Sequence, residues 1–160
     1  EIGELTKSAP LEEAERVRRL LEQNRSMERE LRRIRDKQSL AEVGDLAKEA
    51  QNVGGVKVLA TRRDGLEPGS MRELIDAAKG KLKSGVAVLI SVTDGKVSIA
   101  AGVTKDLSGR IHAGNLVKDM AARVGGKGGG RPDFAQAGGR DTTKVGEALA
   151  AVPAIIEKMV

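Results

Sequence analysis

The stretch GGKGGGRPDFAQAGG, residues 125–139, constrains the backbone more than any other part of this chain, because seven of its fifteen residues are glycine. Glycine adopts positive φ angles and lets a backbone approach a partner closely. Successive N–H groups in such a segment can face an anion. A flexible linker is the alternative, but linkers favour small polar residues, whereas this stretch contains Pro132 and the chain's one aromatic residue, Phe134. We therefore predict a binding loop.

Positive charge is concentrated around this stretch. Seven Lys or Arg residues and three Asp residues lie between Lys105 and Arg140, so most of the formal net charge of +5 falls there. A local basic surface suits a phosphate backbone. Because the chain has one Phe and neither Trp nor Tyr, recognition by shape and phosphate contacts is favoured over the stacking of bases on aromatic side chains.

The candidate RNA-binding residues combine cations for phosphates, glycines for close approach, and polar side chains for hydrogen bonds. Two of them have a structural alternative: Phe134 as an anchor for its own loop, and Asp133 as a partner of Arg131 or a cap of local N–H groups. The candidates are Lys105, Lys118, Lys127, Gly128, Gly129, Gly130, Arg131, Asp133, Phe134, Gln136 and Arg140.

This glycine stretch and the preceding segment AAGVTKDL, residues 100–107, resemble the C-terminal domain of bacterial alanyl-tRNA synthetase, and the similarity extends along nearly the whole chain. The resemblance implies a domain that binds tRNA (tRNA-Ala), at the outer corner of its L shape. It also implies that the domain helps the catalytic and editing domains of the same parent chain act on one tRNA. The parent would be an aminoacyl-tRNA ligase, and this piece would be non-catalytic.

The same fold is associated, more distantly, with the DHH phosphoesterases, whose versions typically carry a histidine after the glycines. Arg131 occupies that place here, which argues against nuclease-type use. An accessory substrate-binding domain of a DHH-type phosphoesterase stays open as one alternative. A dimerisation module with an incidental basic loop is another.

Other chemistry lacks its sequence signals. The glycines do not follow the GxxxxGK[ST] spacing of a nucleotide-binding loop, and His112 is the one histidine in a chain without cysteine, so a zinc site is not expected. No nucleophile, base and acid recur at a catalytic spacing. The longest candidate for an apolar run, residues 86–92, is too short to cross a membrane. We expect no catalytic residue, metal or cofactor here, and a cytoplasmic location.

The N-terminal region predicts a long helix that begins near residue 10, capped by Ser8. Apolar residues recur there at alternating spacings of three and four, which is the heptad pattern of a coiled coil. With Asn24 at an a position, the pattern favours a parallel homodimer; packing back on a second helix, residues 40–52, is the alternative. The seam residues are Val17, Leu20, Asn24, Met27, Leu31 and Ile34.

The remainder predicts a globular α+β unit, so we divide the chain into a helical part, residues 1–53, and a globular part, residues 54–160. Strands are expected at residues 56–61, 86–92 and 97–103, with Asp94-Gly95 as a hairpin turn. A helix lies between the first two strands, started by a capping box of Ser70 and Glu73, so these strands should be parallel and the sheet mixed.

Two more helices are expected in the C-terminal part of the chain. One spans roughly residues 110–124 and ends at the glycines that follow it. The other is capped by Asp141, and Pro153 should kink or restart it. The predicted fold is therefore a mixed sheet with packed helices, preceded by the long heptad-containing helix.

Overall fold

The computed structural model describes residues 13–160, with side chains described for residues 14–34 and 47–160. The cap predicted at Ser8 lies outside the described residues. The chain divides into two compact units, residues 1–39 and 40–160, and each is described by itself. The predicted boundary between residues 53 and 54 stays a prediction.

Helix α2, Glu13–Leu46, is continuous across the region expected to hold the heptads. Over residues 14–34 its large apolar side chains are exposed, from 37% for Val17 to 58% for Met27. The Arg and Glu residues that crowd its other positions make the helix solvated on most of its surface. The heptad pairing itself stays a prediction.

The second helix predicted over residues 40–52 is wrong in its C-terminal half. Helix α2 ends at Leu46, the short 3-10 helix η1 spans Ala47–Glu49, and β1, Gln51–Val53, is a strand. The reason is the turn that follows: Gly54 and Gly55 have φ angles of 57° and 84°, which is the conformation of a two-residue hairpin turn. Val53 is thereby paired with Val56, and both are buried.

The globular unit is built on a six-stranded sheet in the order β1-β2-β3-β4-β6-β5. Strands β2 and β3 are parallel, joined by helix α3, and the other neighbouring pairs are antiparallel. The predicted mixed α+β sheet is therefore confirmed. The remaining bounds are β2, Val56–Arg62; α3, Pro68–Leu82; β3, Val86–Thr93; β4, Lys96–Val103; β5, Lys127–Gly130; and β6, Phe134–Gly139.

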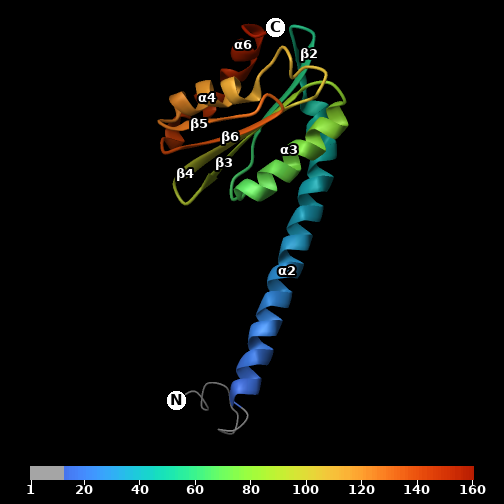
Figure 1. Ribbon diagram of the computed structural model, residues 1–160, viewed down its shortest axis with the longest axis vertical. Coiled ribbons are helices and arrows are strands. Elements are labelled where there is room, and N and C mark those ends of the chain that lie inside the picture. The colour runs from blue at the N-terminus through green and yellow to red at the C-terminus, as the bar shows by residue number, and fades with distance from the viewer. Residues whose placement is uncertain (1–12) are drawn as a thin grey trace. The chain divides into compact units, whose positions relative to one another are not determined.

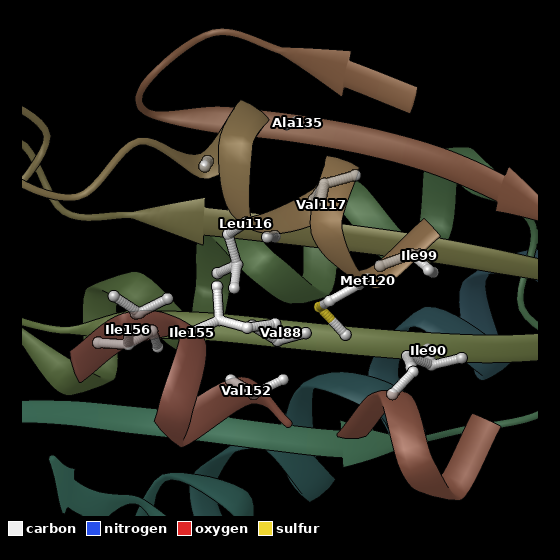
Figure 2. Packing of buried hydrophobic residues seen from close by; sticks show 14 of the residues in the cluster. Val88, Ile90, Ile99, Leu116, Val117, Met120, Ala135, Val152, Ile155 and Ile156 are labelled. Atoms are coloured by element: carbon white, nitrogen blue, oxygen red, sulfur yellow. The ribbon is translucent and has the colours of Figure 1, made fainter. Parts of the chain in front are cut away.

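Helices cover both faces of this sheet. Helix α3 lies on one face, and α4, Ala113–Arg123, lies with α5, Val145–Ala150, and α6, Val152–Glu157, on the other (Figure 1). On the second face, side chains from α4 and α6 point onto the strands, among them Leu116, Met120 and Ile156 (Figure 2), all fully buried. Strand β3 is buried on both faces because it is central, which explains its continuous apolar sequence.

The capping box predicted for the helix between the first two strands is wrong. Helix α3 begins at Pro68, before the expected capping box of Ser70 and Glu73, and its N-cap residue Glu67 makes no side-chain cap bond. Proline suits the first helical turn, because its missing N–H has no partner there and its φ is already helical. Helix α4 uses His112 as its N-cap, and the imidazole accepts a hydrogen bond from the N–H of Gly114.

Several turns and caps are confirmed. Asp94 and Gly95 have positive φ angles in the β3–β4 hairpin turn, and Gly125, with φ of 63°, follows α4. Asp141, predicted to cap the last helix, instead caps the 3-10 turn η2, Thr142–Lys144, and α5 follows with Lys144 as an N-cap that makes no side-chain cap bond. Pro153 lies at the start of α6, where the helical path restarts after α5. These are local signals that depend on few neighbouring residues, which is why the sequence showed them.

Candidate nucleic-acid interface

The glycine stretch is a β-hairpin, which corrects the loop expected from its composition. Strands β5 and β6 pair antiparallel, from Lys127 with Gly138 to Gly130 with Ala135, and the turn is closed by a hydrogen bond from the N–H of Arg131 to the carbonyl of Phe134. Strand β6 also pairs with β4, so the glycines extend the main sheet and β5 forms its edge.

Packing by itself requires glycine at two positions of β5. A Cβ on Gly128 would lie 2.1 Å from the Cβ of Ala137, and a Cβ on Gly130 would lie 2.7 Å from that of Ala135. Helix α4 also starts close by, because a Cβ on Gly114 would meet the carbonyl of Gly130 at 2.6 Å. Gly129 differs: nothing lies within 4 Å of its Cβ position. Of these three β5 glycines, Gly129 is therefore the one that packing alone does not require to be glycine.

Alternate residues of β6 point to opposite faces of the sheet, as in any strand. Phe134 packs at the edge of the apolar cluster beneath α3, and the guanidinium carbon of Arg72 lies 4.9 Å from the centroid of its ring. Gln136 Nε2 donates to the carbonyl of Pro68 at 2.9 Å. Both side chains thus hold the hairpin against α3, which matches the anchoring alternative for Phe134.

Arg131 and Asp133 form a two-point ion pair at the tip of the hairpin. Arg131 Nε and one terminal nitrogen each donate to a different oxygen of Asp133 at 3.0 Å. The hydrogen bond from Arg131 holds the pKa of the Asp133 carboxyl below its usual value. This agrees with the alternative expected for Asp133, a local partner of Arg131. Both side chains are largely exposed, so the pair remains accessible to a ligand.

The structure places four of the candidate residues in two surface hollows, Lys105 and Asp133 in one and Lys127 and Arg140 in the other. One, here the Lys105 hollow, lies beside the hairpin tip; the other, here the Lys96 hollow, lies at the opposite end of β6. The Lys105 hollow is lined by Lys79, Lys83, Val103, Thr104, Lys105, Asp106 and Asp133. The Lys96 hollow is lined by Lys96, Val97, Ser98, Gly125, Gly126, Lys127, Gly138, Gly139 and Arg140.

Strand register separates the two hollows. Gly102 is opposite Phe134 and Val97 is opposite Gly139, so the two ends are five residue steps of extended strand apart, about 17 Å at roughly 3.4 Å per step. Lys105 and Asp133 belong to one end, and Lys127 and Arg140 to the other. Lys118 is exposed on α4 and lines neither hollow.

The hollows differ in charge. In the Lys105 hollow, hydrogen bonds from Ser84 and Thr104 hold the pKa of Asp106 below its usual value, and Asp133 is likewise acidic, so both carboxylates offset the lysines. Lys79 is in addition paired with Asp76 at 2.9 Å. The Lys96 hollow is lined by three cations and no carboxylate. Its positive potential is therefore less offset than that of the other hollow.

Sequence reasoning missed Lys79, Lys83 and Lys96 as neighbours of the motif. Lys96 follows the Asp94-Gly95 turn, so its place at a hairpin end was readable from the sequence. Its position beside Lys127 depends on the pairing of β4 with β6, and no local pattern specifies which strands of a sheet are neighbours.

Two features are absent from the part of the chain that the structure describes. Over that part, no group of three or more His, Cys, Asp and Glu side chains is arranged to hold a metal ion. No helix there is long and apolar enough to cross a membrane.

The order of the strands and the glycine hairpin packed under α4 define a class of domain. The model of the DHHA1 domain matches residues 55–158, and the chain belongs to this family. The curated relatives are more specific. The chain is 46% identical over 143 residues to the alanine–tRNA ligase of Solibacter usitatus, covering 89% of this chain and 16% of that protein. It is 45% identical over 154 residues to that of Ralstonia nicotianae, covering 96% and 17%.

The chain thus spans about a sixth of the length of these relatives. Among solved structures, it is similar to the C-Ala domain of Aquifex aeolicus alanyl-tRNA synthetase, with a TM-score of 0.64 and 29% identity, covering 68% of this chain and 97% of that one. The resemblance drawn from the glycine motif is confirmed. A DHH domain from a member of a ribosomal-protein family, 15% identical with a TM-score of 0.50, covers 77% of this chain and 31% of that one, and shows the fold alone.

Proposed function

We propose that this chain is the tRNA-binding C-terminal module of an alanine–tRNA ligase. It binds tRNA-Ala at the outer corner, in the cytoplasm, and uses no metal or cofactor of its own. The observation that carries the proposal is the identity of about 45% to alanine–tRNA ligases over 96% of the chain. By holding the tRNA, the module raises the effective concentration of its acceptor end at the aminoacylation and editing domains of the same parent.

The geometry supports phosphate and shape recognition. Cations lie at both ends of the hairpin, in hollows about 17 Å apart by strand length, so they address separate parts of an RNA backbone. The chain's one aromatic ring is half-buried and has Arg72 over it, which leaves little surface for stacking a base. A folded tRNA offers a backbone shape that such a surface can recognise without reading bases.

Titration of labelled tRNA-Ala into the chain at several salt concentrations tests the proposal. We expect binding whose affinity falls as salt rises, with a log–log slope of about 0.7 to 0.9 for each phosphate contact. An intact, folded chain that does not bind tRNA at low salt contradicts the proposal. So does an affinity that does not change with salt.

The exposed apolar residues of α2 favour a second role, assembly. Leu20, Met27, Leu31 and Ile34 are each about half exposed or more within the chain, and such side chains at heptad spacing are buried when two helices pair. We infer a parallel dimer through α2. Sedimentation of the whole chain should give a dimer at high concentration, and a chain starting at Leu40 should give a monomer. A monomeric whole chain at high concentration contradicts the dimer.

A further inference from the structure

Within the globular unit, residues 40–160, strand ends and turns line the Lys96 hollow, and no helix residue of that unit does. Ser98 in β4 is opposite Gly138 in β6. Two residues along each strand, Ala100 and Gln136 both contact α3 or its apolar cluster, so Ser98 and Gly138 face the same side of the sheet as α3. Helix α3 begins at Pro68, level with Gln136. Two residues further along β6, Gly138 is exposed, so the sheet surface is open to a ligand there.

Glycines form much of the floor of this hollow, and two of them pack directly against other backbone. Gly126 and Gly139 approach other backbone so closely that a Cβ on Gly126 would lie 1.8 Å from the carbonyl oxygen of Gly138, and one on Gly139 would lie 2.6 Å from that of Val124. The carbonyl of Val124 also accepts hydrogen bonds from the N–H groups of Arg140 and Asp141, both at 3.0 Å. The segment that leads to Arg140 is therefore fixed to the end of α4.

The three cations around this floor differ from other cations near the hairpin. Over the side chains that the structure describes, no carboxylate pairs with Lys96, Lys127 or Arg140, whereas Arg123 and Arg131 are both paired. Three cations around an open backbone floor match a polyanion with oxygen acceptors. A single Asp or Glu side chain of a partner protein fits the three cations less well, because it carries one negative charge, whereas a phosphodiester chain carries one on each phosphate.

We propose that the Lys96 hollow is a phosphate-binding subsite for a polynucleotide backbone, with Lys96 as a contact that the glycine motif does not contain. It deepens the proposed function and rests on it. The hairpin tip with Arg131 is a separate contact at the other end of β6. The subsite thus extends the RNA surface from the motif onto the β3–β4 hairpin.

The first test removes one charge. Lys96→Ala should weaken binding of intact tRNA about four- to sixfold at about 0.15 M salt, and lower the log–log salt slope by roughly 0.7 to 0.9. Lys158→Ala is the matched control, because Lys158 is exposed just after α6, which packs near β1 at the opposite edge of the sheet. The control should change neither value. Equal effects of the two substitutions overturn the subsite and leave tRNA binding standing.

The second test does not depend on tRNA. Pyrophosphate added to the ¹⁵N-labelled chain should shift the amide signals of Gly125, Gly126 and Gly138, and these shifts should be lost in Lys96→Ala. Gly138→Val keeps all charges and should also lose these shifts, because the new side chain occupies the surface where the phosphate would lie. The chain can keep its fold, because the Cβ position of Gly138 is 3.7 Å from its nearest neighbour, the carbonyl oxygen of Val97. Amides that do not move in the parent chain, or that move equally in Lys96→Ala, overturn the subsite whatever the result with tRNA.

Discussion

The two ends of the glycine hairpin carry similar numbers of cations and differ in how those charges are balanced. At the tip, Arg131 is paired with Asp133 and the lysines share their hollow with two carboxylates. At the other end, Lys96, Lys127 and Arg140 surround exposed glycine backbone without a carboxylate. Charge counted along the sequence treats these ends alike. The difference arises from which side chains the sheet brings together, and it predicts that the ends contribute unequally to RNA binding.

The glycines of β5 should give the largest effect. Gly128→Val forces a side chain into Ala137, and overpacking of this kind costs about 1 to 3 kcal/mol or more, so the free energy of unfolding should fall. Gly129→Val enters open space and should leave the free energy of unfolding unchanged within about 0.5 kcal/mol, while it weakens tRNA binding by blocking close approach. Urea unfolding and tRNA titration of both variants measure the two effects.

Equal loss of stability in the two variants would contradict the packing described for Gly128. Unchanged tRNA binding in Gly129→Val would show that the outward surface of β5 is not part of the interface.

Charge reversal at the two ends comes next in size. Lys127→Glu removes a cation with no described partner, whereas Arg131→Glu removes one whose charge Asp133 already offsets. We expect both to lower tRNA affinity, with the larger loss for Lys127→Glu, and the double variant to lower it further without unfolding. Each lost phosphate contact should reduce the log–log salt slope by roughly 0.7 to 0.9. Circular dichroism and melting provide the control for folding, and a larger loss for Arg131→Glu would reverse the comparison.

Asp133→Asn should give the smallest effect, and it should raise tRNA affinity where the preceding substitutions lower it. Removal of this carboxylate leaves Arg131 unpaired, so tRNA affinity should rise modestly. The pKa of Asp133 is lowered in the folded chain, so its pairing stabilises the fold above the pKa of the unfolded carboxyl, about 3.9, and this contribution is lost as pH falls through the lower folded value. Melting curves across that pH range should show a smaller acid-side loss in the variant. Weaker tRNA binding by Asp133→Asn would indicate that the ion pair itself contacts RNA.

Local signals made much of the fold predictable. Asp94-Gly95, Gly125 and Pro153 each act through their own backbone geometry, and each of these predictions was confirmed. One error came where tertiary structure decides. The glycine stretch was expected to be a binding loop because glycine allows positive φ angles and close approach, yet β4 and α4 supply the pairing and packing that make it a hairpin.

The site was predictable in part for the same reason. The motif residues lie on one hairpin because they are close in sequence. Their division between two hollows, and the presence of Lys96 in one of them, follow from strand neighbours that are far apart in the chain. The pairing of Arg131 with Asp133 could be predicted from the sequence, because the two residues are separated only by Pro132 and are near each other whichever strands are neighbours.

Recognition of a folded tRNA body, as opposed to any RNA backbone, is tested most directly by comparing two ligands under one set of conditions. Affinities for intact tRNA-Ala and for an isolated acceptor-stem hairpin are measured with the same chain at the same salt, together with an intact tRNA of another identity. We expect the two intact tRNAs to bind similarly and the hairpin at least about tenfold more weakly, since only an intact tRNA offers the corner shape. Equal affinity for the hairpin and for intact tRNA would contradict recognition of the outer corner and leave a general basic surface.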